Sequence, residues 1–229
     1  MKPINRTLSD HLVEAMRERI LSSALPPDQP VRQDVLAAEM GVSKIPLREA
    51  LARLEQEGLV RSHAHRGFFV CPLSTEEAEE VYALRLKLEP DAVALAAERA
   101  TVVERNTAEQ VLATLDRVTT IHGDGVGAFN RAFHLALIRP CGQFTTIFIL
   151  ERLQVLSERY VRKHLEQLGR DERANDEHRQ IFKAWVEGKP RKVHELMARH
   201  IDKTLRDLRQ QLEVEAAPKD TPPRRSRSA

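Results

Sequence analysis

The chain has 229 residues, of which 41% are hydrophobic and 4% aromatic, and its formal net charge is +2. This hydrophobic share supports a core, which excludes wholesale disorder, and the length suits one large domain or two small ones. Because the net charge is small, a bulk polycation is excluded, and any binding to nucleic acid must rest on a local basic surface. No apolar run reaches the length of about 18 residues that a membrane-spanning helix needs. The two cysteines, Cys71 and Cys141, form neither a metal-ligand spacing nor a disulfide framework. We therefore expect a cytoplasmic protein that does not enter a membrane.

Two helices are predicted at the start of the chain. Apolar residues recur at helical spacing from Leu8 to Leu21, and Ser9 is a candidate N-cap for this helix. The proline-rich segment of residues 25–30 ends it and forms a rigid turn. A shorter helical pattern follows and stops at Gly41.

A third helix and a hairpin come next. The helix is predicted between Ser43, a candidate cap, and Gly58, with Pro46 in its first turn, where a missing N–H is tolerated. Two β-prone runs, residues 59–63 and 68–71, then flank a turn that contains glycine. Three helices followed by a two-stranded hairpin form a winged helix-turn-helix.

From residue 75 onward the sequence shows only helical patterns. Breakers divide them into expected helices at about residues 75–100, 105–121, 125–139, 143–167, 171–187 and 190–212. The fold class is therefore mainly α, a winged helix-turn-helix followed by an all-α bundle of about six helices. The expected division is a winged helix-turn-helix domain at 1–72, a linker at 73–75, a helical domain at 76–212 and a tail at 213–229. The end of the tail is rich in Pro, Arg and Ser, which predicts disorder.

These segments carry a family resemblance. Leu36–Val60 resembles the DNA-binding domain of the GntR family of transcription regulators, and Arg66–Val70 resembles its wing. The helical part resembles the FCD domain, the ligand-binding domain of the FadR-type branch, in its metal-binding form. The segments that carry this second resemblance are Leu84–Glu89, Asn130–His134, Glu177–Ile181 and Met197–His200. Over roughly residues 8 to 212, the resemblance implies a ligand-responsive, sequence-specific regulator of transcription and favours a repressor. A homodimer of such a protein would bind a palindromic operator in double-stranded DNA.

The third predicted helix carries candidate base-reading residues. Lys44 and Arg48 are four residues apart, so they share one face, and both side chains can donate hydrogen bonds to guanine in the major groove. The resemblance supports both positions. Ser43 and the start of the helix, which Pro46 helps to set, can hold a phosphate through backbone N–H groups.

Further contacts are expected from the wing and from the second helix. The predicted wing tip carries His65, Arg66 and Gly67. Gly67 allows the backbone to approach DNA closely, and Arg66 can reach the minor groove or a phosphate. Arg32 lies just before the second helix and is another candidate phosphate contact.

Four residues of the helical part form a candidate metal site. Asn130 and His134 are four residues apart and share a helix face, while His178 and His200 lie on later helices. Three imidazoles and one oxygen donor suit Zn²⁺ or Ni²⁺, although the spacing alone is a weak signal. The resemblance implies these four residues as ligands of a divalent metal, with Asn130 where Asp is common. A neutral amide oxygen binds a dication more weakly than a carboxylate does.

Three nitrogens and one oxygen leave coordination positions open for a small carboxylate effector. Arg85 resembles the arginine that such domains aim into the pocket, and a guanidinium can bind a carboxylate bidentately. The alternative is a helix-packing arginine that pairs with Glu89, one turn later. Arg159 and Arg162 are further candidates for the pocket wall.

Three other interpretations compete with this one. The metal itself could be the signal, which would make the protein a metal-responsive repressor. The helical domain could bind a fatty-acyl-type ligand without metal, although the presence of three histidines argues against this. A metalloenzyme would need a general base, but Glu177 precedes His178, and neighbours on a helix point about 100° apart. Since the sequence also lacks a His-Glu-x-x-His motif, we expect no enzymatic activity.

Overall fold

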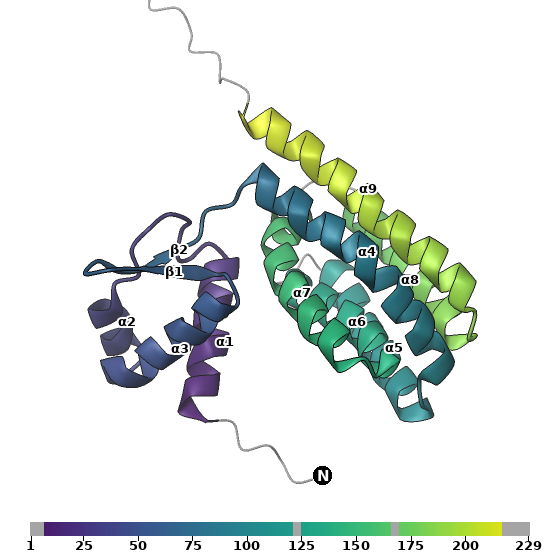
Figure 1. The fold of residues 1–229 in the computed structure, drawn as a ribbon, viewed down its shortest axis with the longest axis horizontal. Helices are drawn as coiled ribbons and strands as arrows, with labels where there is room; N and C mark the ends of the chain where they lie inside the picture. Colours follow the sequence, from purple (N-terminus) through teal and green to yellow (C-terminus); the bar gives the residue numbers. More distant parts are fainter. Residues whose placement is uncertain (1–6, 121–124, 166–169, 217–229) are drawn as a thin grey trace, which may run out of the picture.

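The computed structural model describes residues 7–120, 125–165 and 170–216 (Figure 1). Residues 213–216 of the expected tail are helical, and the rest of that tail lies outside the described residues. The described chain is α-helical apart from one hairpin, which confirms the predicted fold class. The winged domain consists of α1 (Leu8–Leu21), α2 (Gln33–Glu39), α3 (Lys44–Gln56), β1 (Val60–His63) and β2 (Gly67–Val70). The helical domain consists of α4 (Thr75–Arg99), α5 (Val102–Thr120), α6 (Val126–Ile138), the 3-10 turn η1 (Arg139–Cys141), α7 (Phe144–Leu165), α8 (Arg170–Val186) and α9 (Pro190–Ala216).

Side-chain caps set the starts of three helices. Thr7 caps α1, because its hydroxyl accepts from the N–H of Asp10 while the Asp10 carboxylate accepts from the N–H of Thr7. The prediction of Ser9 as the cap is therefore wrong by two residues. The same reciprocal pair joins Thr101 to Glu104, so α5 begins three residues earlier than expected. Ser74 caps α4, because its hydroxyl accepts from the N–H of Glu77.

The winged domain has its own core. The apolar face of α3 is fully buried against α1 at Leu47, Leu51 and Leu54. The hairpin pairs Val60 with Val70 in an antiparallel register. Burial of these apolar side chains fixes α3 and therefore determines which of its residues face solvent.

The helical domain is a bundle in which α4 and α9 run side by side in opposite directions (Figure 1). Its core contains the fully buried Tyr82, Phe133 and Trp185. None of the described helices is long and apolar enough to cross a membrane. The winged domain lies beside the C-terminal half of α7, and Val155 of α7 packs into the core of the winged domain.

Candidate nucleic-acid interface and metal site

The start of α3 presents the two predicted base-reading residues to solvent. Lys44 and Arg48 are both exposed on this helix. Lys44 forms an ion pair with Asp34 of α2, and an exposed pair of this kind is worth only about 0–1 kcal/mol, so a DNA phosphate or base can replace it. Arg48 makes no ion pair or side-chain hydrogen bond within the described part of the chain. Both side chains can therefore turn toward DNA at a small cost in free energy.

Other residues predicted to contact DNA lie near the start of α3. Ser43 is the N-cap residue of α3 with extended backbone, but its hydroxyl makes no capping bond, and Pro46 lies in the first turn. Arg32 is exposed at the N-cap position of α2. Sequence reasoning missed Ile45, which is 71% exposed beside Lys44. An exposed apolar side chain there suits the methyl group of thymine, and the signal was an apolar residue outside the buried stripe of the helix.

The wing tip is a tight turn with exposed side chains. His65 and Gly67 have positive φ angles of 61° and 80°, which the turn requires. The guanidinium of Arg66 lies 5.2 Å from the centre of the Phe69 ring, in a cation–π contact that orients it. His65 and Arg66 are exposed.

Three of the predicted metal ligands converge inside the helical domain. His134 from α6, His178 from α8 and His200 from α9 are 1%, 1% and 6% exposed. One candidate ligand nitrogen from each lies within 4.8 Å of the others. Distant parts of the sequence thus place three imidazoles around one point in a buried environment.

Carboxylates fix the protonation of two of these rings. Nδ1 of His134 lies 2.6 Å from Glu89 Oε1, and Nδ1 of His200 lies 2.9 Å from Glu177 Oε2. Burial raises the pKa of Glu89, but the charge of Arg85 and the hydrogen bond from His134 outweigh this effect and hold the pKa at about 2. An ionised carboxylate can only accept a hydrogen bond, so each Nδ1 carries a proton and the lone pair of a neutral ring is left on Nε2.

These lone pairs fit a cation. Nε2 of His134 and Nδ1 of His178 are buried without a hydrogen-bond partner among the described residues, and Nε2 of His200 lies 3.3 Å from Nε2 of His178. Burial lowers the pKa of His134 to about 4 and that of His178 well below its usual value, so both rings are neutral at pH 7. Neutral imidazoles held by carboxylates through Nδ1 are the usual environment of histidine metal ligands. The sequence had shown Glu89 only as a partner of Arg85 and Glu177 only as a doubtful base.

A small cavity adjoins the histidines. Its volume is about 20 Å³, and its wall includes Arg85, Asn130, His134 and His200. This space suits one ion or one water molecule, not an organic acid. Asn130 is thus beside two histidines, as expected, and can offer its amide oxygen to the same space.

Arg85 combines the two roles that the sequence left open. It is 2% exposed and its Nε donates to Glu89 at 2.9 Å, so it is a buried helix partner. It also faces the cavity, and its Nη1 donates to Ser157 at 3.2 Å. A carboxylate that enters the cavity would compete with Glu89 for this guanidinium.

Arg159 and Arg162 lie elsewhere than expected. Arg159 donates to the backbone carbonyl of Cys71, and Arg162 donates to Glu18 of α1 at 2.7 Å. Successive residues of a helix point about 100° apart, and Val161 occupies the cavity side of α7. Both arginines therefore face the winged domain and do not line the cavity.

Comparison with known proteins agrees with this arrangement. Residues 8–70 match the model of bacterial regulatory proteins of the gntR family, and residues 80–203 match the FCD domain model. An HTH-type transcriptional regulator from the TAR-I ttuE-ttuC' intergenic region of Agrobacterium vitis is 32% identical over 136 residues, 56% of this chain and 78% of its own length. The HTH-type transcriptional repressor GlaR of Escherichia coli is 26% identical over 196 residues, 81% of this chain and 89% of its own length. The structure of E. coli McbR/YncC shares the fold with a TM-score of 0.78 at 22% identity, over 90% of this chain and 99% of that one. The chain therefore belongs to the GntR family of bacterial transcription regulators, in the FadR-type branch that carries an FCD domain.

Proposed function

We propose that this transcription regulator binds a palindromic operator as a homodimer and that a ligand in the helical domain changes its affinity for DNA. The ligand is a small carboxylate held beside a divalent metal ion. The observation that carries the proposal is the buried convergence of His134, His178 and His200, two of them oriented by carboxylates. Such an arrangement is costly to bury without a function.

The metal would be Zn²⁺ or Ni²⁺, held by Asn130, His134, His178 and His200. When bound, it would supply positive charge that attracts an acid. Arg85 would bind the carboxylate of the effector from the cavity wall. Because the cavity measures only about 20 Å³, the effector must widen it by separating Arg85 from Glu89 or Ser157.

A second candidate is a repressor for which the metal ion is itself the signal. The size of the cavity favours this alternative, since an ion fits without any rearrangement. Metal analysis separates the two. Metal that stays bound through purification and dialysis supports an ion that anchors an effector, whereas metal that exchanges and changes DNA affinity supports metal sensing.

On the DNA side, Lys44 and Arg48 would read bases, while Arg32, Ser43 and Arg66 would contact phosphates or the minor groove. Pro46, His65 and Gly67 would set the backbone that brings these contacts to the DNA. Two winged domains related by two-fold symmetry would recognise two half-sites.

The dimer would form where α7 of this chain meets a second copy of the chain. Phe144 and Phe148 lie one turn apart at its start and are 83% and 64% exposed. Aromatic side chains this exposed are typical of protein interfaces.

The experiment is a selection of DNA from a pool of genomic fragments by the purified protein, followed by gel-shift titration. We expect a palindromic duplex to bind with nanomolar affinity and its scrambled form to bind far more weakly. Elemental analysis of the same preparation should find about one metal ion per chain, and His178→Ala should lose it. Equal binding of both duplexes would contradict the operator proposal, and a metal-free wild type that takes up no added Zn²⁺ would contradict the metal site.

A further inference from the structure

Helix α7 contributes to the surroundings of the metal cavity through one of its faces. Gln154 donates to Glu89 at 3.0 Å, and the Ser157 hydroxyl accepts from Arg85 at 3.2 Å. Val161, one turn further, lines the cavity itself. This face of α7 therefore holds the two charged residues that an anionic effector has to rearrange.

The other face of the same two turns holds the winged domain. Val155 is 8% exposed and belongs to the core of the winged domain. Arg159 donates to the Cys71 carbonyl just before α4, and Arg162 pairs with Glu18 of α1. Residues 154–162 thus contact the cavity residues and the DNA-binding part at the same time.

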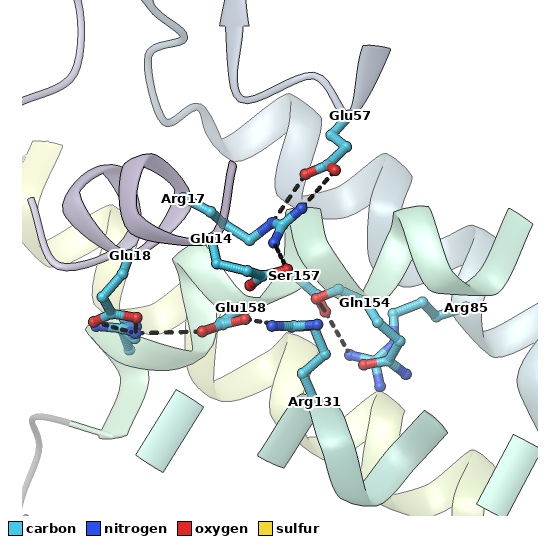
Figure 2. Close-up of polar contacts among 10 residues, drawn as sticks. Glu14, Arg17, Glu18, Glu57, Arg85, Arg131, Gln154, Ser157 and Glu158 are labelled. Atoms are coloured by element: carbon cyan, nitrogen blue, oxygen red, sulfur yellow. Dashed lines mark hydrogen bonds and ion pairs between the residues drawn. The ribbon is translucent and has the colours of Figure 1, made fainter. Parts of the chain in front are cut away.

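A buried charge cluster tightens this contact. Glu158 has no exposed surface on its side chain and lies between Arg131 of α6, at 2.6 Å, and Arg162, at 3.4 Å. Figure 2 shows Glu18, Glu158 and Arg131 in one row, with Gln154 and Ser157 on the side toward Arg85. This row of charges joins α1, α7 and α6, and close-packed elements of this kind shift as units.

A glycine on α6 makes room for this cluster. A Cβ atom at Gly127 would lie 2.9 Å from Cγ of Arg162 and 3.1 Å from Cγ of Glu158. Any larger residue at position 127 of α6 would displace the side chains of Arg162 and Glu158. Position 127 is therefore a place where the coupling can be disturbed without touching the cavity or the DNA surface.

We propose that residues 154–162 of α7 couple the metal cavity to the position of the winged domain. An anion that pairs with Arg85 removes the contact to Ser157 and frees Glu89 from its ion pair, α7 shifts, and the winged domain follows through Val155, Arg159 and Arg162. Regulation is then located on this helix. This inference rests on the proposed function, since it needs a DNA-binding readout.

The test is a double-mutant cycle read as affinity for the duplex obtained in the selection above, measured by fluorescence anisotropy. Ser157→Ala removes the acceptor of Arg85 inside the helical domain. It is made in the wild type and in a loosened background, Glu18→Ala with Val155→Ala, in which Arg162 keeps its pair with Glu158. We expect Ser157→Ala to change the affinity about fivefold in the wild type and less than about twofold in the loosened background.

A matched control is Thr114→Ala, which also removes a hydroxyl that donates to its own helix but lies on α5, away from α7. It should leave the affinity unchanged. Gly127→Ala should change the affinity as Ser157→Ala does, with an unaltered circular dichroism spectrum. Equal factors for Ser157→Ala in both backgrounds, or no effect of Gly127→Ala, would overturn the proposal. Failure to select any duplex would instead count against the proposed function.

Discussion

Replacement of Glu89 by Gln tests the buried charge network beside the cavity. Glu89 is fully buried and accepts from Arg85 at 2.9 Å, from His134 at 2.6 Å and from Gln154 at 3.0 Å. Glutamine keeps the shape but removes the charge and places an NH₂ donor where two donors already point. The guanidinium of Arg85 would be buried without its counter-ion, and loss of one partner of a buried pair costs about 3–5 kcal/mol.

Glu177→Gln is the matched control. Glu177 also accepts from a histidine, His200, and from Lys203, but its side chain is 21% exposed, so water replaces part of the lost interaction. We expect a loss of about 1 kcal/mol or less in the free energy of unfolding for Glu177→Gln and about 3 kcal/mol for Glu89→Gln.

Urea unfolding followed by circular dichroism at pH 7, in the presence of a chelator, measures both losses without a metal contribution. Zinc titration by calorimetry then gives a second readout, and each variant should bind zinc about 10–100-fold more weakly, because each carboxylate orients a histidine. If Glu89→Gln destabilises the protein no more than Glu177→Gln does, the buried network is not the source of stability that we describe.

Three further predictions follow from the same geometry. Burial lowers the pKa of His134 from 6.5 to about 4. As the pH falls, the unfolded chain therefore binds a proton at this histidine at a higher pH than the folded chain does. The free energy of unfolding of the metal-free protein should fall by up to ~3 kcal/mol between about pH 6.5 and pH 4. A urea series across this pH range checks it, and His134→Gln should flatten the pH dependence. Arg48→Ala should weaken operator binding about 10–100-fold and relax the sequence preference, whereas Arg32→Ala should weaken binding equally for all sequences, as anisotropy with mismatched duplexes would reveal. Phe144→Ser with Phe148→Ser should sediment as a monomer at micromolar concentration, and a persistent dimer would place the interface elsewhere.

Local signals made much of the fold predictable. Apolar spacing, prolines and glycines located the helices and the hairpin, because these features act within a few residues of the chain. The start of α1 was misplaced because Ser9 and Thr7 are both good caps, and only Thr7 has an acid three residues later, which completes a reciprocal pair. The spacing of Thr7 and Asp10 is therefore a local signal that distinguishes the two candidate caps.

The side of α7 that faces the cavity could not be predicted in the same way. Arg159 and Arg162 were expected at the cavity but contact the winged domain, because the packing of two domains decides which helix face is inside. The roles of Glu89 and Glu177 also depend on tertiary contacts, since each contacts a histidine on another helix. Helix spacing identified Asn130 and His134 as one group, but only the family resemblance joined them to His178 and His200.

The most direct test of the account is the affinity of the selected duplex for the zinc-loaded protein, measured with a panel of small carboxylic acids. We predict that at least one acid changes this affinity about tenfold, and that the change disappears when the metal is removed or when Arg85 is replaced by Met. An acid-induced change that persists without metal, or no response to any acid in a zinc-loaded protein that binds the duplex, would contradict the central claim that an acid is sensed at the metal.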